Sequence, residues 1–124
     1  MKVLVVDDEI DIQPLFRQRF RKEIKLGEIL FEFALSGEDA LNYLTQDGSE
    51  VVLILSDVNM PGMSGLELLK YIRQQHESTP PFVMMITAYG NEDSYLQSMQ
   101  LGADDFLTKP LDFNLLKEKL KNLK

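Results

Sequence analysis

Residues 51–57 read VVLILSD, five consecutive apolar residues followed by a serine and an aspartate. Two other short runs have the same continuous apolar character, VLVV at 3–6 and FVMMI at 82–86. Strands of a parallel sheet are covered by helices on both faces, so they are apolar throughout rather than alternating. The three runs therefore predict strands of a buried parallel sheet.

The segments between these strands carry apolar residues at helical spacing, which predicts helices. The five stripes are Ile12, Leu15, Phe16, Phe20 and Ile24; Ala40, Leu41 and Leu44; Leu68, Leu69 and Ile72; Tyr95, Leu96 and Met99; and Leu116, Leu120 and Leu123. Further strands are predicted at 29–34 and 105–107. The resulting order is strand then helix, five times, which predicts an α/β, doubly wound fold with helices on both faces of one parallel sheet.

Helix ends have their own signals. Ser36 followed by Asp39 predicts a capping box, and Asn91 and Asp112 are predicted N-caps of the last two helices. Gly102 suits the position just past a helix end.

The amino-acid composition and net charge exclude several classes of protein. The 124 residues suit one domain, residues 1–124, and include no cysteine and one histidine, which excludes disulfide scaffolds, thiolate chemistry and multi-histidine zinc sites. The net charge of −7 argues against direct nucleic-acid binding. With no apolar run near the ~20 residues of a membrane span, we expect a cytoplasmic protein that does not contact the membrane.

Polar residues follow the predicted strands. Ligands of an open parallel sheet bind beyond the carboxyl ends of its strands, where the side chains are Asp7, Asp8, Asp57, Thr87 and Lys109. Crowded carboxylates with a partly open site suit Mg²⁺, and one of them can act as a nucleophile toward phosphorus. Taken singly, each of these residues also fits a solvated turn, a helix cap or a surface charge.

Four motifs in this order resemble the receiver domain of two-component response regulators, similar to single-domain chemotaxis-type regulators. They are VLVVDDE at 3–9, LILSDVNMPGMSGLELL at 53–69, MMITAYG at 84–90 and GADDFLTKPLD at 102–112. The resemblance covers the whole chain and implies a (βα)5 flavodoxin-like sandwich with sheet order 2-1-3-4-5. It leaves open whether the chain is complete or a domain of a longer protein.

The resemblance also implies site residues. Asp57 matches the phosphoacceptor, Thr87 the hydroxyl that bonds a phosphoryl oxygen, and Lys109 the lysine that pairs with the acceptor. The implied Mg²⁺ ligands are Asp7, Asp8, Asp57 and the backbone carbonyl of Asn59.

A switch is implied as well. Thr87 moves toward the phosphoryl group, and Phe106 turns inward, which changes the surface formed by the helix between Asn91 and Gly102, the strand at 105–107 and the last helix. Pro110 matches a proline that often follows a cis bond. Tyr89 either shields the aspartyl phosphate from water, slowing its hydrolysis, or is a mobile surface aromatic.

The implied partners are a sensor histidine kinase or a histidine phosphotransfer protein, and an output domain or downstream protein on the switch surface. The chain would catalyse only its own phosphotransfer and slow dephosphorylation. Two alternatives stay open: a receiver-like interaction module that is not phosphorylated, and an aspartyl-nucleophile phosphatase, against which Asn59 argues because such enzymes usually have an acid there.

The first predicted helix carries three basic residues spaced four apart, Arg17, Arg21 and Lys25. They form either a solvated flank or a docking surface for the phosphodonor.

Overall fold

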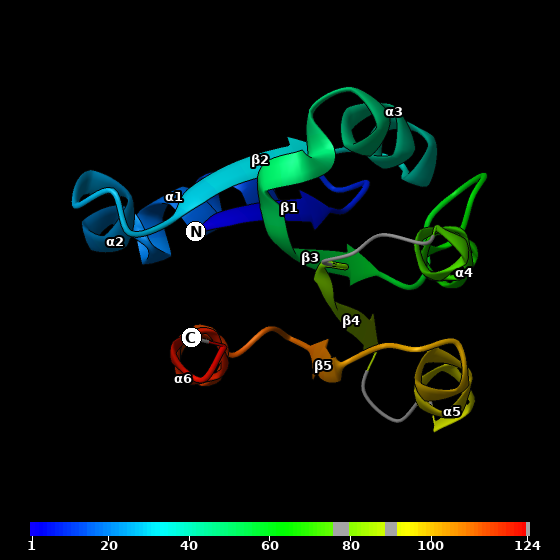
Figure 1. Ribbon diagram of the computed structural model, residues 1–124. Helices are drawn as coiled ribbons and strands as arrows, with labels where there is room; N and C mark the ends of the chain where they lie inside the picture. The colour runs from blue at the N-terminus through cyan, green and yellow to red at the C-terminus, as the bar shows by residue number, and fades with distance from the viewer. Residues whose placement is uncertain (76–79, 89–91, 124) are drawn as a thin grey trace.

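The computed structural model describes residues 1–75, 80–88 and 92–123, and Figure 1 shows its arrangement. Strands alternate with helices along the chain. The strands are β1 (Lys2–Val6), β2 (Leu30–Ala34), β3 (Val51–Asp57), β4 (Phe82–Ala88) and β5 (Asp105–Lys109). The helices are α1 (Ile12–Arg19), α2 (Arg21–Lys25), α3 (Gly37–Asp47), α4 (Gly65–Gln74), α5 (Glu92–Gln100) and α6 (Phe113–Lys121), with a 3₁₀ turn, η1, at Gly48–Glu50.

All strand pairs in the sheet are parallel, and the spatial order is β2-β1-β3-β4-β5. The predicted doubly wound fold and its strand order are therefore confirmed. The order reverses beside β1, which leaves the carboxyl ends of β1 and β3 next to each other. This is the position where an open α/β sheet holds its ligand.

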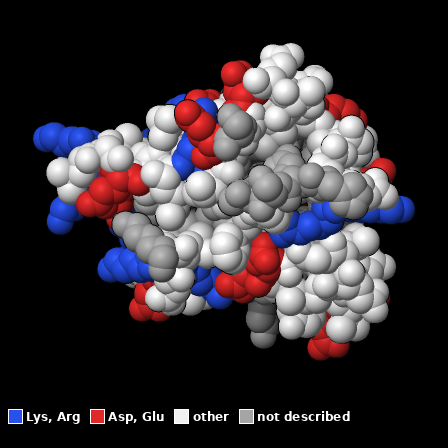
Figure 2. Space-filling model, in the orientation of Figure 1, with Lys and Arg blue, Asp and Glu red and all other residues white. Residues whose placement is uncertain are grey.

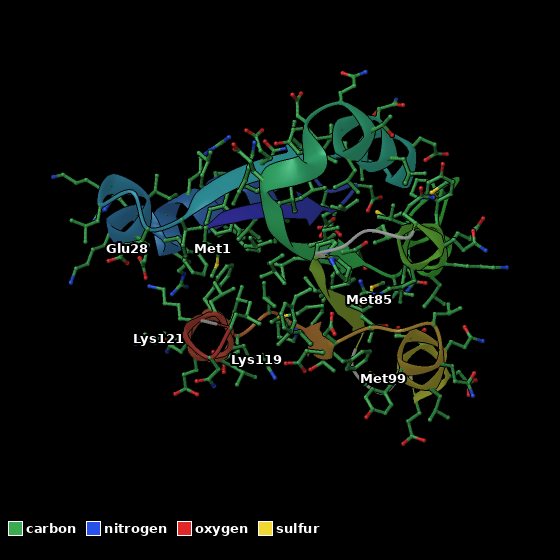
Figure 3. All side chains as sticks on the ribbon, in the orientation of Figure 1. Met1, Glu28, Met85, Met99, Lys119 and Lys121 are labelled. Carbon is green, nitrogen blue, oxygen red and sulfur yellow. The ribbon has the colours of Figure 1, made fainter. Side chains whose placement is uncertain are left out.

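Two apolar cores lie on opposite faces of the sheet. Side chains from β1, β3 and β4 alternate between them: Leu4 and Met85 belong to the core under α3, α4 and α5, and Val5 and Met84 to the core under α1 and α6. Figure 3 shows Met85 inside the molecule, whereas Met99 lies at its periphery on α5. Burial on both faces explains why these strands read as continuous apolar runs.

The first predicted helix is divided at Phe20, whose backbone leaves helical geometry at φ −108° and ψ 20°. Hydrogen bonds still connect the Phe20 amide to Phe16 and the Ile24 amide to Phe20. The rings of Phe16 and Phe20 are fully buried and stacked 6.1 Å apart. The apolar stripe thus does face the core, although the chain bends within it.

The predicted stripe on α5 does not face the core, which corrects that expectation. Tyr95, Leu96 and Met99 are exposed, and the buried residues of the helix are Ser94 and Ser98. Helical periodicity was right about the helix, but small residues allow it to pack closely, so its larger apolar side chains face solvent.

Among residues 1–75, 80–88 and 92–123, three side chains cap helices. Asp112 accepts hydrogen bonds from the amides of Asn114 and Leu115, as predicted, and Ser36 accepts one from Asp39. The reciprocal capping box is instead formed by Ser64 and Glu67 at the start of α4. The predicted cap at Asn91 lies outside the described residues.

A salt-bridged arginine ties together the edge of the sheet opposite the strand carboxyl ends. Arg73 of α4 donates to the backbone oxygens of Gly102 and Pro81, each at 2.9 Å, and to the Asp104 carboxylate at 2.7 Å. The same Asp104 oxygen accepts from the Val83 amide. One side chain therefore fixes α4, the start of β4 and the turn before β5.

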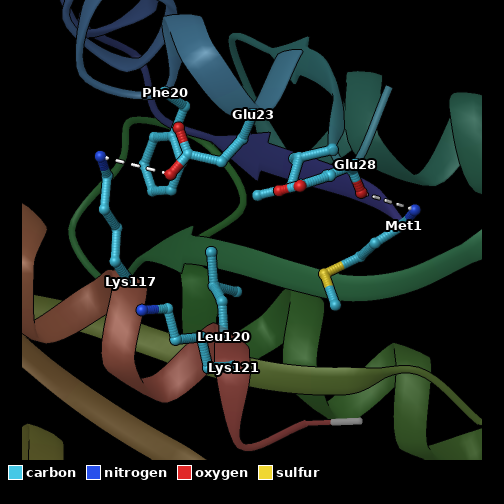
Figure 4. Close-up of a pocket in the computed structure, with 8 residues that line it drawn as sticks. Met1, Phe20, Glu23, Glu28, Lys117, Leu120 and Lys121 are labelled. Carbon is cyan, nitrogen blue, oxygen red and sulfur yellow. Dashed lines mark hydrogen bonds and ion pairs between the residues drawn. The ribbon is translucent and has the colours of Figure 1, made fainter. Parts of the chain in front are cut away.

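A small pocket lies at the amino ends of β1 and β2, between α2 and α6 (Figure 4). Lys117 of α6 pairs with Glu23 of α2 at 3.3 Å, and its amine lies 5.2 Å from the centre of the Phe20 ring. On the far side of the pocket the amine of Met1 donates to the backbone oxygen of Glu28 at 3.0 Å. These contacts hold α6 against α2.

Gly65 begins α4 directly against the backbone of β3. Its amide donates to the carbonyl of Val58 at 2.9 Å. A Cβ added at Gly65 would overlap the carbonyl oxygen of Asp57 and lie 2.9 Å from the Cα of Val58. The close approach requires a residue without a side chain at this position.

Gly65→Ala is accordingly expected to lower the free energy of unfolding by about 2 kcal/mol or more, because overpacking displaces backbone and not a flexible side chain. Urea denaturation followed by circular dichroism measures the change. Gly48→Ala is the control, since its added Cβ would meet only the Leu44 side chain, at 3.2 Å. Equal losses in the two variants would contradict this account.

Candidate functional site

The carboxyl edge of the sheet gathers the predicted side chains. Asp7 and Asp8 follow β1, Asp57 ends β3, Thr87 lies near the end of β4 and Lys109 ends β5. The strand register places Asp57 beside Ile86, and Ala88 beside Lys109. Side chains from four strands therefore meet at one edge.

Three carboxylates are clustered there. Asp7, Asp8 and Asp57 each offer an oxygen, and these oxygens lie within 4.8 Å of one another. Asp7 and Asp57 are buried, whereas Asp8 is exposed. An oxygen-only set that is open to solvent on one side fits the ligand preference of Mg²⁺, which retains part of its water shell.

Lys109 provides the positive charge of the cluster. Its amine donates to an Asp57 carboxylate oxygen at 2.8 Å and lies 3.9 Å from one of Asp7. The peptide between Lys109 and Pro110 is cis, in agreement with the resemblance. The amine thus lies beside the carboxylate that is the predicted acceptor.

Burial and the contacts within the cluster leave the pKa values of Asp7 and Lys109 above their ordinary values. Burial raises the pKa of the Asp7 carboxyl; the hydrogen bond from the Glu9 amide lowers it, and the charge of Asp57 raises it again, leaving it above the ordinary value. Burial lowers the pKa of the Lys109 amine, but the hydrogen bond and charge of Asp57, together with the charge of Asp7, raise it above its ordinary value. The lysine therefore stays charged beside carboxylates that repel one another.

Backbone groups position the acidic side chains. The amide of Glu9 donates to Asp7 at 2.9 Å, and the amide of Asn59 donates to Asp57 at 3.3 Å. The Ser56 hydroxyl donates to the backbone oxygen of Asp57 at 3.1 Å. One oxygen of Asp57 is thus held by Lys109 and the other by Asn59.

Thr87 is fully buried, and within the described part of the chain its hydroxyl has no hydrogen-bond partner. A buried hydroxyl without a partner is costly, so one in a native structure calls for an explanation. A ligand oxygen at this edge of the sheet would satisfy it.

Phe106 lies on β5, the strand that pairs with the strand of Thr87. It pairs with Met85, and its half-buried ring meets the exposed Tyr95 ring edge-to-face at 4.9 Å. Thr87 pairs with Thr108, so Thr87 and Phe106 stand on neighbouring strands, two register positions apart. Tyr89 lies outside the described residues.

Gly65 was not singled out from the sequence, although its backbone contact sets the position of Asp57. The available signal was the serine–glycine pair at 64–65, at a helix start directly after a turn. In the structure Asp105 pairs with Lys119 at 2.7 Å and Asp104 with Arg73, both within the chain.

Comparison with known proteins identifies the family. The response regulator receiver domain family matches residues 3–121, so the chain belongs to the response regulator receiver domains. It is 42% identical over 119 residues to the response regulator protein PilR of Pseudomonas aeruginosa and 35% identical over 120 residues to sporulation initiation phosphotransferase F of Bacillus subtilis. These matches cover 94% and 97% of this chain.

The chain spans 24% of PilR and 50% of the response regulator RppA of Synechocystis, but 90% of the Bacillus protein. Solved structures agree with the fold. The chemotaxis protein CheY4 of Vibrio cholerae superimposes with a TM-score of 0.82 at 28% identity, covering 99% of this chain and 98% of that one. The response regulator TrrA of Thermotoga maritima, solved in complex with Mg²⁺–BeF, superimposes with a TM-score of 0.79 at 33% identity. That match also covers 99% of this chain and 98% of the other.

The family and the site together support receiver-type signalling and not a classical enzyme with its own substrate. The acid cluster of Asp7, Asp8 and Asp57 is compatible with the Mg²⁺ binding seen in TrrA. Among the helices that the structure describes, none has the length and apolar character needed to cross a membrane.

Without divalent cations, Asp7→Asn is expected to raise the free energy of unfolding at pH 7 by on the order of 1 kcal/mol. The raised pKa means that the folded state binds the proton more tightly than the unfolded state, so the charged carboxylate costs stability above that pKa. The gain should shrink as the pH falls through the folded-state pKa. Urea unfolding with a chelator, repeated between neutral and acidic pH, measures it.

Asp8→Asn is the matched control, because Asp8 is exposed and its replacement relieves no burial cost. The substitution at Asp7 is expected to stabilise the protein more than the one at Asp8. A loss of stability in Asp7→Asn at pH 7 would rule out burial as the dominant cause.

Proposed function

We propose that this chain is a two-component receiver that accepts a phosphoryl group on Asp57 and passes the signal on through Thr87 and Phe106. The observation that carries the proposal is the pairing of two features at one edge of the sheet. A buried carboxylate is hydrogen-bonded to a lysine, and a buried threonine hydroxyl at the same edge has no hydrogen-bond partner among the described residues. Phosphoryl transfer requires positioning and charge neutralisation of this kind.

Asp7, Asp8, Asp57 and the carbonyl of Asn59 would hold Mg²⁺. The metal, when bound, neutralises charge on the carboxylates and on the phosphoryl oxygens. The donor set fits the ion, because it consists only of oxygens and three of them lie within 4.8 Å of one another. It would also offset the negative charge of Asp57, which adds to burial in raising the pKa of Asp7.

In the proposed step, an Asp57 oxygen forms a bond to phosphorus as the bond from phosphorus to the donor breaks. With a phosphohistidine donor, the imidazole nitrogen departs with the bonding pair and takes up a proton. Lys109 stays beside the product and pairs with the phosphoryl oxygens. The transfer balances without an oxidant or reductant.

The phosphoryl group brings roughly two negative charges and strong acceptor oxygens. The Thr87 hydroxyl would donate to one of them. Because Thr87 pairs with Thr108 in β5, two residues beyond Phe106, its displacement would reach the Phe106 ring and, through Tyr95, helix α5. The exposed apolar residues of α5 would then form a changed surface for an output domain or downstream protein.

Phosphodonors would be a sensor histidine kinase or a histidine phosphotransfer protein in the cytoplasm. A relative of similar length is consistent with a role in phosphotransfer: this chain covers 90% of sporulation initiation phosphotransferase F of Bacillus subtilis. Two other outcomes have distinct signatures. An interaction module would not be phosphorylated at all, and a phosphatase would turn over a phosphoester many times.

Incubation with acetyl phosphate and Mg²⁺, followed by intact mass measurement, tests the acceptor. Wild type is expected to gain one phosphoryl group, and Asp57→Asn none, because the amide cannot replace the carboxylate nucleophile. A chelator should abolish the gain. Asp105→Asn is a control acid away from the site and should be phosphorylated normally.

A gain that survives Asp57→Asn would show that another residue is the acceptor. No gain in any protein, with acetyl phosphate or with a phosphorylated histidine donor, would favour the interaction module. Multiple-turnover release of phosphate from a phosphoester would favour the phosphatase.

The role of Thr87 is tested by separating phosphorylation from its consequence. Thr87→Ala should still gain the phosphoryl group but should lose most of the change in amide chemical shifts that phosphorylation produces in β5 and α5. Thr87→Ser keeps the hydroxyl and should retain the change. Equal shift changes in Thr87→Ala and wild type would exclude the hydroxyl as the coupling group.

A further inference from the structure

The described residues carry a strip of uncompensated positive charge on an acidic protein. Arg17, Arg21 and Lys25 follow one another along α1 and α2, whereas the whole chain has a net charge of −7. Within the described ranges, no ion pair involves any of the three. Lys117 of the neighbouring helix α6, by contrast, pairs with Glu23.

These cations border a groove and not a flat surface. Arg17, Arg21 and Lys25 line it together with Ile24, Leu30 and Phe31. Leu30 is 54% exposed although it belongs to a strand, so part of the floor is apolar and open to solvent. The Arg17 guanidinium is held 4.9 Å from the centre of the Phe33 ring, which keeps it at the rim.

The groove lies at the free edge of the sheet. β2 is the outermost strand and pairs only with β1. An exposed sheet edge is a place where another chain can add contacts, and edges are usually protected by charge. The charged residues that line the groove are all positive, and they stand beside the exposed apolar side chain of Leu30.

The groove is also remote from Asp57. α1 begins beyond the carboxyl end of β1 and runs back along the sheet, so α2 lies beside the amino ends of β1 and β2 (Figure 1). The hydrogen bonds from Ile29 and Glu28 to the Glu23 carbonyl anchor α2 there. In Figure 2, basic side chains project from this end of the molecule.

We infer that the groove bounded by Arg17, Arg21, Lys25 and Leu30 is a docking site for an acidic segment of a partner protein that also carries apolar side chains. Carboxylates of the partner pair with the strip, and an apolar side chain covers Leu30. Charge complementarity selects this occupant. An anionic lipid surface is disfavoured for two reasons. A flat surface does not fit into a groove, and its charge would repel the rest of a molecule with seven excess negative charges.

Because the site is at the far edge of the sheet, occupation of it leaves Asp57 open. The partner is therefore bound in both phosphorylation states and can remain bound during phosphotransfer. This separates the docking site from any surface on which a phosphodonor covers Asp57.

Three short peptides are the probes: one with glutamates and leucines, one with serine in place of each leucine, and one with lysine in place of each glutamate. The ¹⁵N-labelled chain is titrated with each peptide at low salt. The glutamate–leucine peptide is expected to shift amides of α1, α2 and β2 and to bind most tightly. Binding should weaken as salt is raised, because exposed charges are screened.

Arg21→Gln/Lys25→Gln should weaken that binding about fivefold, from the loss of two exposed charge pairs. Lys70→Gln/Lys121→Gln removes the same net charge from other exposed helix positions and should leave it unchanged. Leu30→Gln should remove the advantage of the leucine peptide over the serine peptide. Asp57→Asn should bind like wild type, which keeps this test independent of phosphorylation.

Equal weakening in the two double variants would overturn the proposal, since net charge alone would then explain binding. Shifts confined to α5 and β5 would place the peptide elsewhere and would overturn it as well. Binding to phosphatidylglycerol vesicles but not to the glutamate–leucine peptide would replace the protein partner with a membrane.

Discussion

Repulsion among carboxylates at the edge of one sheet is the constraint on which the site depends. The fold places the ends of β1 and β3 side by side, so Asp7 and Asp57 are held close together, and Asp8 adds a third carboxylate from the exposed turn after β1. Lys109 offsets part of their charge from β5, two strands away from β3. The remaining negative charge makes the site compatible with a bound cation, and without one it lowers the stability of the fold.

Several contacts of α4 fix the backbone around Asp57 against this repulsion. Gly65 brings the start of α4 against the backbone of Asp57, and the Ser64–Glu67 box fixes the first turn of that helix. Arg73, at the other end of the same helix, joins it to β4 and to the turn before β5. A helix held at both ends keeps the Asp57 carboxylate near its neighbours despite the repulsion.

Much of this could be predicted from residue order alone. Continuous apolar runs indicate buried parallel strands, and such strands must end at a common edge, so Asp7, Asp57, Thr87 and Lys109 could be brought together before any coordinates. The contacts of Arg73 could not be, because they join residues about thirty positions apart whose pairing depends on how the helices pack. The orientation of α5 could not be predicted either. Periodicity shows that one side of the helix is apolar, but not which side packs against the sheet.

Helix α5 illustrates what such an arrangement does to local stability. Its sheet-facing residues are Ser94 and Ser98, which bury little apolar area, and its larger side chains stand in solvent. The free energy that holds this helix on the sheet is therefore small compared with that of α4, whose Leu68, Leu69 and Ile72 are buried. Amide hydrogens of α5 should exchange with solvent through local opening, without unfolding of the domain. Helix α5, which contacts Phe106 through Tyr95, is therefore the layer of this sheet that the smallest free energy would displace.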